Sequence, residues 1–225
     1  MINIINQYMT NTGSDIDYYI YLKNHVESAL REGEISRSKI TSDILSMDGM
    51  TGTKTRHFYN NLLTLKDARY LEIGTWKGSS VCSAMYGNTA NVFCIDNWST
   101  FGGPKVDFLN NLSKFKGNNE VQFIESDCFK VDVASLPKFN IYLFDGEHTY
   151  EDQYNALAYY YNCLDDMFIF MADDWNYERV RKGTQDAVKN LKLNVLYEKE
   201  IFTEYIGVKD GWWNGLGIMI LKKSK

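Results

Sequence analysis

Carboxylate side chains stand at or near the end of almost every predicted strand in the middle of this chain. In an open α/β sheet, ligands bind beyond the carboxyl ends of the strands, so we expect these acids to meet at one edge. Carboxylates placed there can accept hydrogen bonds from sugar hydroxyls or bind a hard cation. The alternative is that they cap the helices that follow. The acids are Glu72, Asp96, Asp127, Asp145, Asp173 and Asp174.

Residues 70–80 read as an apolar strand, a turn containing glycine and the start of a helix. The turn has the spacing E-x-G-x-x-x-G and departs from G-x-G-x-x-G, because Trp76 stands where a second glycine would let the backbone approach a pyrophosphate. No G-x-x-x-x-G-K-[ST] phosphate loop occurs either. Asp96, at the tip of the next strand, is placed to accept hydrogen bonds from ribose hydroxyls. The pattern predicts a ligand with adenosine but no phosphate groups.

These features resemble the class I S-adenosylmethionine-dependent methyltransferases. The resemblance implies that Glu72 lies near the methionine amino group, with a purely structural pairing as the alternative. It also implies that Asp127 and Cys128 contact the adenine, with capping of a helix as the alternative for Asp127. Trp98 is expected either to stack on a ring of the ligand or to pack within its own loop. The cofactor-binding residues implied are Glu72, Gly74, Thr75, Gly78, Ser79, Ser80, Asp96, Asn97, Trp98, Asp127, Cys128 and Asp145.

A second block, F-D-G-E-H-T-Y at 144–150, pairs with M-A-D-D-W-N at 171–176 and supplies three carboxylates from two strand tips. Three hard oxygen ligands suit Mg²⁺. The two blocks resemble the metal-dependent O-methyltransferases of the catechol and macrocin (macrolide sugar) type, which contain a D-G-x-H block. That resemblance implies that Asp145, Asp173 and Asp174 bind Mg²⁺.

Methyl transfer to a hydroxyl also needs a base, and the resemblance gives two candidates, Glu147 and His148. We favour His148, whose ordinary pKa suits proton transfer near neutrality. The alternative is a metal-free site in which Asp173 and Asp174 cap the helix that starts near Glu178 and His148 only touches the cofactor. The function expected is O-methylation of a small molecule or saccharide with S-adenosyl-L-methionine as donor.

The elements that position these residues alternate along the chain. Apolar runs predict strands near 69–73, 91–95, 121–125, 140–144, 167–172, 194–202 and 214–221, and helices near 78–86, 104–115, 150–163 and 178–191. This order predicts a Rossmann-like, doubly wound α/β sheet of seven strands, mostly parallel. The loop around Gly207 is too short for a crossover helix, so one antiparallel strand is expected near the C-terminus.

The residues before the first strand are predicted to be mainly helical. Helical spacing covers 15–31 and 56–65, with a polar loop at 47–54 between them. We expect 1–66 to form a helical cap or lid on a methyltransferase domain at 67–225, the whole being one compact unit. The resemblance brings Thr51 or Lys54 near the methionine carboxylate, with a solvated lysine as the alternative for Lys54.

Composition narrows the classes of partner. The chain is 44% hydrophobic with a net charge of −5, and it has no Lys/Arg cluster dense enough to track a phosphate backbone, so nucleic acid is not expected as a partner. No apolar run approaches the length of a membrane span, and we expect a soluble, cytoplasmic protein without a membrane partner. The four cysteines lack metal-ligand spacing and should be reduced thiols.

Several alternatives stay open at this point. A metal-independent methyltransferase acting on protein or RNA is the second interpretation. A Rossmann-type NAD-binding dehydrogenase is disfavoured by Trp76, and a non-catalytic cofactor-binding module by the retained acids and His148. Trp212 and Trp213 fit either hairpin packing or a homodimer contact. The sequence carries no readable code for the acceptor.

Overall fold

The computed structural model describes residues 2–224, with side chains from residue 14 onward. In this part of the chain, seven strands form one sheet in the order β3-β2-β1-β4-β5-β7-β6, and β7 runs antiparallel to both of its neighbours while the other pairs are parallel. The predicted α/β fold is confirmed. The strands are β1 (Arg69–Ile73), β2 (Asn91–Asp96), β3 (Glu120–Glu125), β4 (Phe139–Phe144), β5 (Leu164–Asp173), β6 (Asn194–Ile201) and β7 (Leu216–Lys222).

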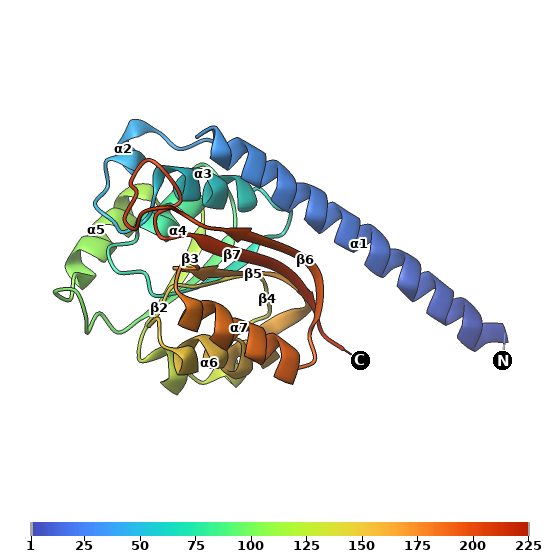
Figure 1. Cartoon of the computed structure of the whole chain (residues 1–225). Helices are drawn as coiled ribbons and strands as arrows, with labels where there is room; N and C mark the ends of the chain where they lie inside the picture. Colours follow the sequence, from blue (N-terminus) through green and yellow to red (C-terminus); the bar gives the residue numbers. More distant parts are fainter. Residues whose placement is uncertain (1, 225) are drawn as a thin grey trace.

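Helices cover both faces of the sheet, as parallel strands require. Figure 1 shows α6 and α7 on one face and α1 and α3 on the other, with α4 beside α3. The helices are α1 (Ile2–Glu34), α2 (Ser42–Leu45), α3 (Thr53–Leu62), α4 (Ser79–Met85), α5 (Lys105–Phe115), α6 (Tyr150–Tyr160) and α7 (Glu178–Asn190). Three 3₁₀ turns add η1 (Cys128–Lys130), η2 (Val133–Ser135) and η3 (Tyr161–Cys163).

The register of the central strands lines up their carboxyl ends. Ile73 of β1 lies opposite Ile95 of β2 and Phe144 of β4, and Phe144 lies opposite Ala172 of β5. The residues that follow therefore form one row across the point where the strand order reverses, the usual ligand-binding crevice of such a sheet. That row is Gly74, Asp96, Asp145 and Asp173.

The N-terminal helices share a hydrophobic core with the sheet. Leu22 and Val26 of α1 and Phe58 of α3 are fully buried, and they belong to the same cluster as Tyr70 of β1 and Ile218 of β7. None of the described helices is long and apolar enough to cross a membrane. The four cysteines are free thiols.

The start of α3 differs from the prediction, which placed it in a loop. The helix begins at Thr53, where the Thr53 and Lys54 amides donate to the carbonyl oxygens of Lys209 and Gly211 at 2.7 and 3.1 Å. The first amides of a helix have no partner within it, so these long-range bonds allow it to start earlier than local periodicity indicates. The sequence pattern predicts no helix at α2, and the helix predicted at 150–163 ends as an α-helix at Tyr160 and continues as the 3₁₀ turn η3.

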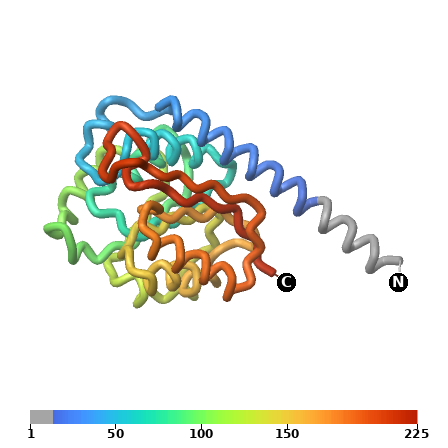
Figure 2. The backbone as a smooth tube through the Cα atoms, viewed as in Figure 1, coloured from blue at the N-terminus to red at the C-terminus, as the bar shows by residue number. Residues whose placement is uncertain are grey.

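The hairpin loop at 202–215 packs on the start of α3, and Figure 2 shows the two segments side by side. Trp212 in this loop is buried, its ring 5.9 Å from that of Phe58, and its Nε1 donates to Glu34 at 2.9 Å. These contacts agree with the first of the two expected roles of Trp212, which is packing of the hairpin loop.

Candidate active site

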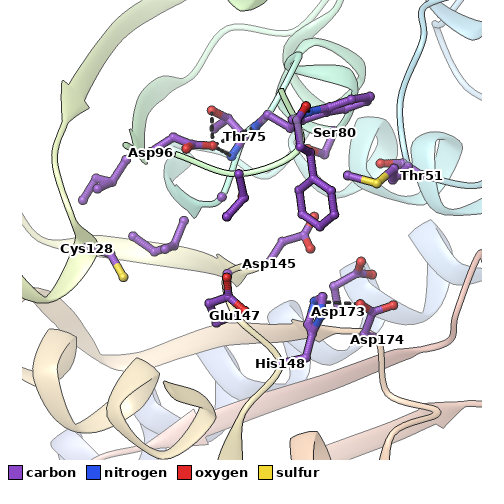
Figure 3. A pocket seen from close by; sticks show the side chains of 18 of the residues that line it. Thr51, Thr75, Ser80, Asp96, Cys128, Asp145, Glu147, His148, Asp173 and Asp174 are labelled. Carbon is purple, nitrogen blue, oxygen red and sulfur yellow. Dashed lines mark hydrogen bonds and ion pairs between the residues drawn. The ribbon is translucent and has the colours of Figure 1, made fainter. Parts of the chain in front are cut away.

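A cavity of about 370 Å³ lies at the carboxyl ends of β1, β2, β4 and β5. Figure 3 shows Asp96 and Thr75 on one side of it and His148, Asp173 and Asp174 on the other. Glu72, Gly78 and Asp127 do not line it. The predicted residues that do are Gly74, Thr75, Ser79, Ser80, Asp96, Asn97, Trp98, Cys128, Asp145, Glu147, His148, Asp173 and Asp174.

Asp96 ties together the two loops that line one side of the cavity. Its Oδ2 accepts hydrogen bonds from the Thr75 and Trp76 amides, both at 2.8 Å, and its Oδ1 accepts from the Trp98 amide at 2.6 Å. A carboxylate has about four acceptor positions, so Oδ1 keeps one for a ligand. The contact between Asp96 and the ribose stays a prediction. The hydrogen bonds of Asp96 also hold the glycine-containing loop after β1 in place.

Several residues other than glycine that line the cavity have a left-handed backbone. Their φ values lie between 45° and 58°. For residues other than glycine, this costs about 1–3 kcal/mol each and persists where the surrounding structure fixes the backbone, commonly at functional sites. Phe101 lies in the loop that follows Asp96, directly before Gly102. The residues are Trp76, Trp98, Phe101, Asp174 and Trp213.

Trp98 packs in its loop instead of standing free for a ligand ring. It is 7% exposed, its ring lies 5.1 Å from that of Phe108, and its Nε1 donates to the Trp76 carbonyl at 2.8 Å. This favours the packing alternative, although part of the residue lines the cavity. Trp76 also lines the cavity, and its indole donates to the Phe101 carbonyl at 3.2 Å.

Glu72 is fully buried behind the cavity wall. Its two carboxylate oxygens accept hydrogen bonds from Tyr70 Oη and Ser80 Oγ, both at 2.6 Å. Burial raises the pKa of Glu72 to about 7, against the opposing effect of these two hydrogen bonds. The pairing agrees with the structural alternative, and contact with the methionine amino group stays a prediction.

Asp127 caps the 3₁₀ turn η1. Its carboxylate accepts a hydrogen bond from the Phe129 amide at 3.0 Å and lies 3.1 Å from Lys130 Nζ. These contacts agree with the capping alternative, while the neighbouring Cys128 lines the cavity. Gly78 directly precedes α4 and has a φ of 84°, a left-handed conformation that glycine adopts readily. It therefore forms the turn between β1 and α4, and it does not line the cavity.

The carboxylates at the other side of the cavity lie close together. Asp173 and Asp174 are 7% and 5% exposed. Burial and then the charge of Asp174 raise the pKa of Asp173 to about 8. Burial, with the charges of Asp173 and Asp174, also raises the pKa of Asp145 well above its ordinary value. Among the described side chains, no lysine or arginine forms an ion pair with any of the three.

The helix-capping interpretation of Asp173 and Asp174 is wrong. Helix α7 begins at Glu178, its N-cap residue is Tyr177, and no side chain makes a cap hydrogen bond there. Both carboxylates instead line the cavity.

His148 is held at the cavity by contacts on three sides. Its Nε2 lies 2.6 Å from Asp174 Oδ2, its ring stacks on Tyr177 at 6.2 Å between centroids, and its carbonyl accepts from Arg179 Nε at 2.5 Å. Burial lowers the pKa of His148, but the hydrogen bond and charge of Asp174, with the charge of Asp173, raise it by more, and the net pKa is above the ordinary value.

The predicted magnesium site fits by donor chemistry but is not preformed. Asp145, Asp173 and Asp174 provide the hard oxygen donors that Mg²⁺ prefers, and Asp174 Oδ1 is buried without a hydrogen-bond partner. However, no three His, Cys, Asp or Glu side chains among those described are positioned to hold a metal ion. Side-chain movement would be needed before these acids could bind one.

The lid expected at 47–54 contributes to the cavity through Thr51 and Met50. Thr51 Oγ1 lies 3.1 Å from Ser79 Oγ at the start of α4. Lys54 does not line the cavity and pairs with Glu34, so it is a lysine in a surface ion pair.

Comparison with known proteins bears on the class of enzyme. Residues 71–175 match a family model described as a methyltransferase domain. The match favours a methyltransferase. It runs from β1 to just beyond β5 and therefore includes the glycine loop, Asp96 and the acids at the tips of β4 and β5. A search of the curated proteins finds no match.

Solved structures show the same fold at low identity. TrmN from Thermus thermophilus has a TM-score of 0.57 and 12% identity over 81% of this chain, which spans 52% of that protein. A candidate O-methyltransferase from Klebsiella pneumoniae has a TM-score of 0.53 and 13% identity over 89% of each chain. The methyltransferase PaMTH1 from Podospora anserina, bound to S-adenosylhomocysteine, has a TM-score of 0.54 and 12% identity over 96% of each chain. At these identities the likeness shows the Rossmann-like fold alone.

Proposed function

We propose that this protein is an S-adenosylmethionine-dependent O-methyltransferase that acts on a hydroxyl of a small molecule or saccharide. The observation that carries the proposal is the pair His148–Asp174, with 2.6 Å between Nε2 and Oδ2, across the cavity from Asp96. The family match supports methyl transfer. The neighbour bound to S-adenosylhomocysteine supports the donor.

One side of the cavity suits an adenosine group. Asp96 keeps an acceptor position on Oδ1, and the Gly74 turn brings the backbone of Thr75 against the cavity. Within the part of the chain that the structure describes, no lysine or arginine lines the cavity, which agrees with a donor that carries no phosphates. When bound, S-adenosylmethionine supplies an electrophilic methyl group.

The other side suits a hydroxyl acceptor. Nε2 of His148 lies 2.6 Å from the Asp174 carboxylate, so we infer that Nε2 carries the proton of the neutral imidazole and that Nδ1 is the basic nitrogen. Nδ1 takes the hydroxyl proton as the acceptor oxygen bonds to the methyl carbon and the carbon–sulfur bond breaks. Asp174 then stabilises the imidazolium that forms. Glu147 is the weaker candidate, because it is exposed and no described side chain orients its carboxylate.

Charge at the cavity favours a neutral acceptor over a nucleic acid. Glu147 and Asp174 line the acceptor side, where carboxylates would repel phosphate groups, and none of the described residues that line the cavity is a lysine or arginine that would attract them. The chain as a whole carries a net charge of −5. These observations support a small molecule or saccharide and make the metal-independent methylation of RNA the less favoured function.

Magnesium dependence stays a prediction within this proposal. The residues that would hold Mg²⁺ are Asp145, Asp173 and Asp174. When bound there, the ion would lower the pKa of an acceptor hydroxyl and orient it.

A methyl-transfer assay tests the proposal. With labelled S-adenosylmethionine and a panel of phenols and sugars, we expect transfer to at least one hydroxyl. His148→Asn should lower the rate by about 10²- to 10⁴-fold, the usual contribution of a general base, while binding of S-adenosylhomocysteine is retained. An unchanged rate in His148→Asn would rule out this base.

A further inference from the structure

Arg56 is a buried cation that the proposed mechanism does not use. It lies on α3 and is 4% exposed. Its Nε donates to the Thr51 carbonyl at 3.1 Å, and its Nη1 donates to the carbonyls of Ile44 and Met47 at 3.1 and 3.0 Å. None of the ion pairs among the described residues includes Arg56. A buried charge without a direct ion pair is costly, so an anionic partner would add to the stabilisation that the charge of the nearby Asp48 provides.

The remaining nitrogen of Arg56, Nη2, points toward the lid and α4. It has no hydrogen-bond partner within the described chain. A Cβ added at Gly49 would lie 2.9 Å from this atom and 2.1 Å from Ser79 Oγ, so only the small Gly49 separates the two groups. Ser79 and Thr51 both line the cavity, with their hydroxyl oxygens 3.1 Å apart. The unpartnered nitrogen therefore lies directly behind a pair of hydroxyls.

We propose that Arg56, acting behind Thr51 and Ser79, is the positive charge that fixes the carboxylate of the amino-acid end of the methyl donor. The inference rests on the proposed function. Two hydroxyl donors backed by a guanidinium suit a carboxylate, because hydrogen bonds to ionised groups are the stronger ones.

Other cations near this wall have partners of their own. Lys77 lies 2.8 Å from Asp48 and 3.4 Å from Asp107. None of the described lysines and arginines lines the cavity itself. Figure 3 shows Thr51 and Ser80 on a different side of the cavity from His148 and Asp174, so this subsite is separate from the acceptor side. Arg56 is a positioning residue here, since it also holds the carbonyl of Thr51.

Calorimetry with two ligands tests this role. S-adenosylhomocysteine has the carboxylate, whereas 5′-methylthioadenosine keeps the adenosine and sulfur and lacks the amino-acid end. Arg56→Gln should weaken binding of S-adenosylhomocysteine by about 10- to 100-fold and leave binding of 5′-methylthioadenosine unchanged. The matched control is Arg69→Gln, which removes a partly buried arginine paired with Asp165 at the opposite end of β1 and should change neither affinity.

The outcomes separate this inference from the proposed function. Equal loss for both ligands, or no loss for either, in Arg56→Gln would overturn the role of Arg56. Should that variant fail to fold, Thr51→Val must show the same selective loss, and its absence would overturn the subsite. If the unaltered protein bound neither ligand, the proposed function itself would fail.

Discussion

Nε2 of His148 lies 2.6 Å from Oδ2 of Asp174, a residue whose own backbone is held in the left-handed region at φ of 55°. The surrounding structure offsets the strain of that conformation. The short distance favours the tautomer of His148 that has its proton on Nε2. This relationship gives the first prediction.

Asp174→Asn should lower the rate of methyl transfer by about 10²-fold or more, because an amide can neither fix the tautomer nor stabilise the imidazolium. Affinity for S-adenosylhomocysteine should be unchanged. The control is Asp186→Asn, which alters a carboxylate paired with Lys182 on the surface of α7. Equal rates in Asp174→Asn and the unaltered protein would contradict the pairing's catalytic role.

Removal of divalent cations tests the magnesium prediction. Turnover should be lost after treatment with EDTA and restored by Mg²⁺, and Asp173→Asn should abolish turnover while binding of S-adenosylhomocysteine stays near its original value. Full activity after chelation would show that the acids act without a metal.

Glu72 should make stability depend on pH. Its pKa in the folded state is raised from 4.5 to about 7, so its contribution is fully present below pH 4.5 and is lost as pH rises through 7. Relative to Glu72→Gln, the unaltered protein should therefore lose about 3 kcal/mol of unfolding free energy between about pH 4.5 and about pH 8. Urea unfolding across this range measures the difference.

The matched control for Glu72 is Glu204→Gln, an exposed carboxyl in the hairpin loop. The unfolding free energy of the Glu204→Gln variant should follow that of the unaltered protein at every pH. Parallel curves for Glu72→Gln and the unaltered protein would show that Glu72 does not carry the shifted pKa.

Gly74 should be irreplaceable at the turn after β1. Its φ is 82°, and a Cβ there would lie 1.9 Å from the Asp145 carbonyl oxygen. Gly102 has nearly the same φ, 85°, with nothing within 4 Å of its Cβ position. Gly74→Ala should therefore destabilise the protein by at least about 2 kcal/mol more than Gly102→Ala, which bears the backbone strain alone. Equal melting temperatures for the two variants would contradict this contact.

The fold could be predicted because apolar runs such as that of β4 are long, and Phe139–Phe144 is buried at every position. The meeting of Asp96, Asp145, Asp173 and Asp174 at one cavity could be predicted because parallel strands end at one edge of the sheet. Glu72 and Asp127 were expected there too and do not line the cavity. Trp212 and Trp213 show where sequence reasoning stops. The two are adjacent, yet Trp212 packs on Phe58 while Trp213 lines the cavity, and only the path of the hairpin loop decides between them.

Long-range contacts account for what was missed at the site. Arg56 is surrounded by backbone carbonyls of the chain segment before it, and an arginine near the start of a helix gives no sign of that burial.

The most direct test of the central claim is calorimetric titration of the purified protein with S-adenosylhomocysteine. The account predicts saturable binding of one molecule per chain, weakened by Asp96→Ala because that change removes the ribose acceptor and frees the loops at Thr75 and Trp98. Absence of any measurable heat from the unaltered protein would contradict the assignment of this cavity to a methyl donor.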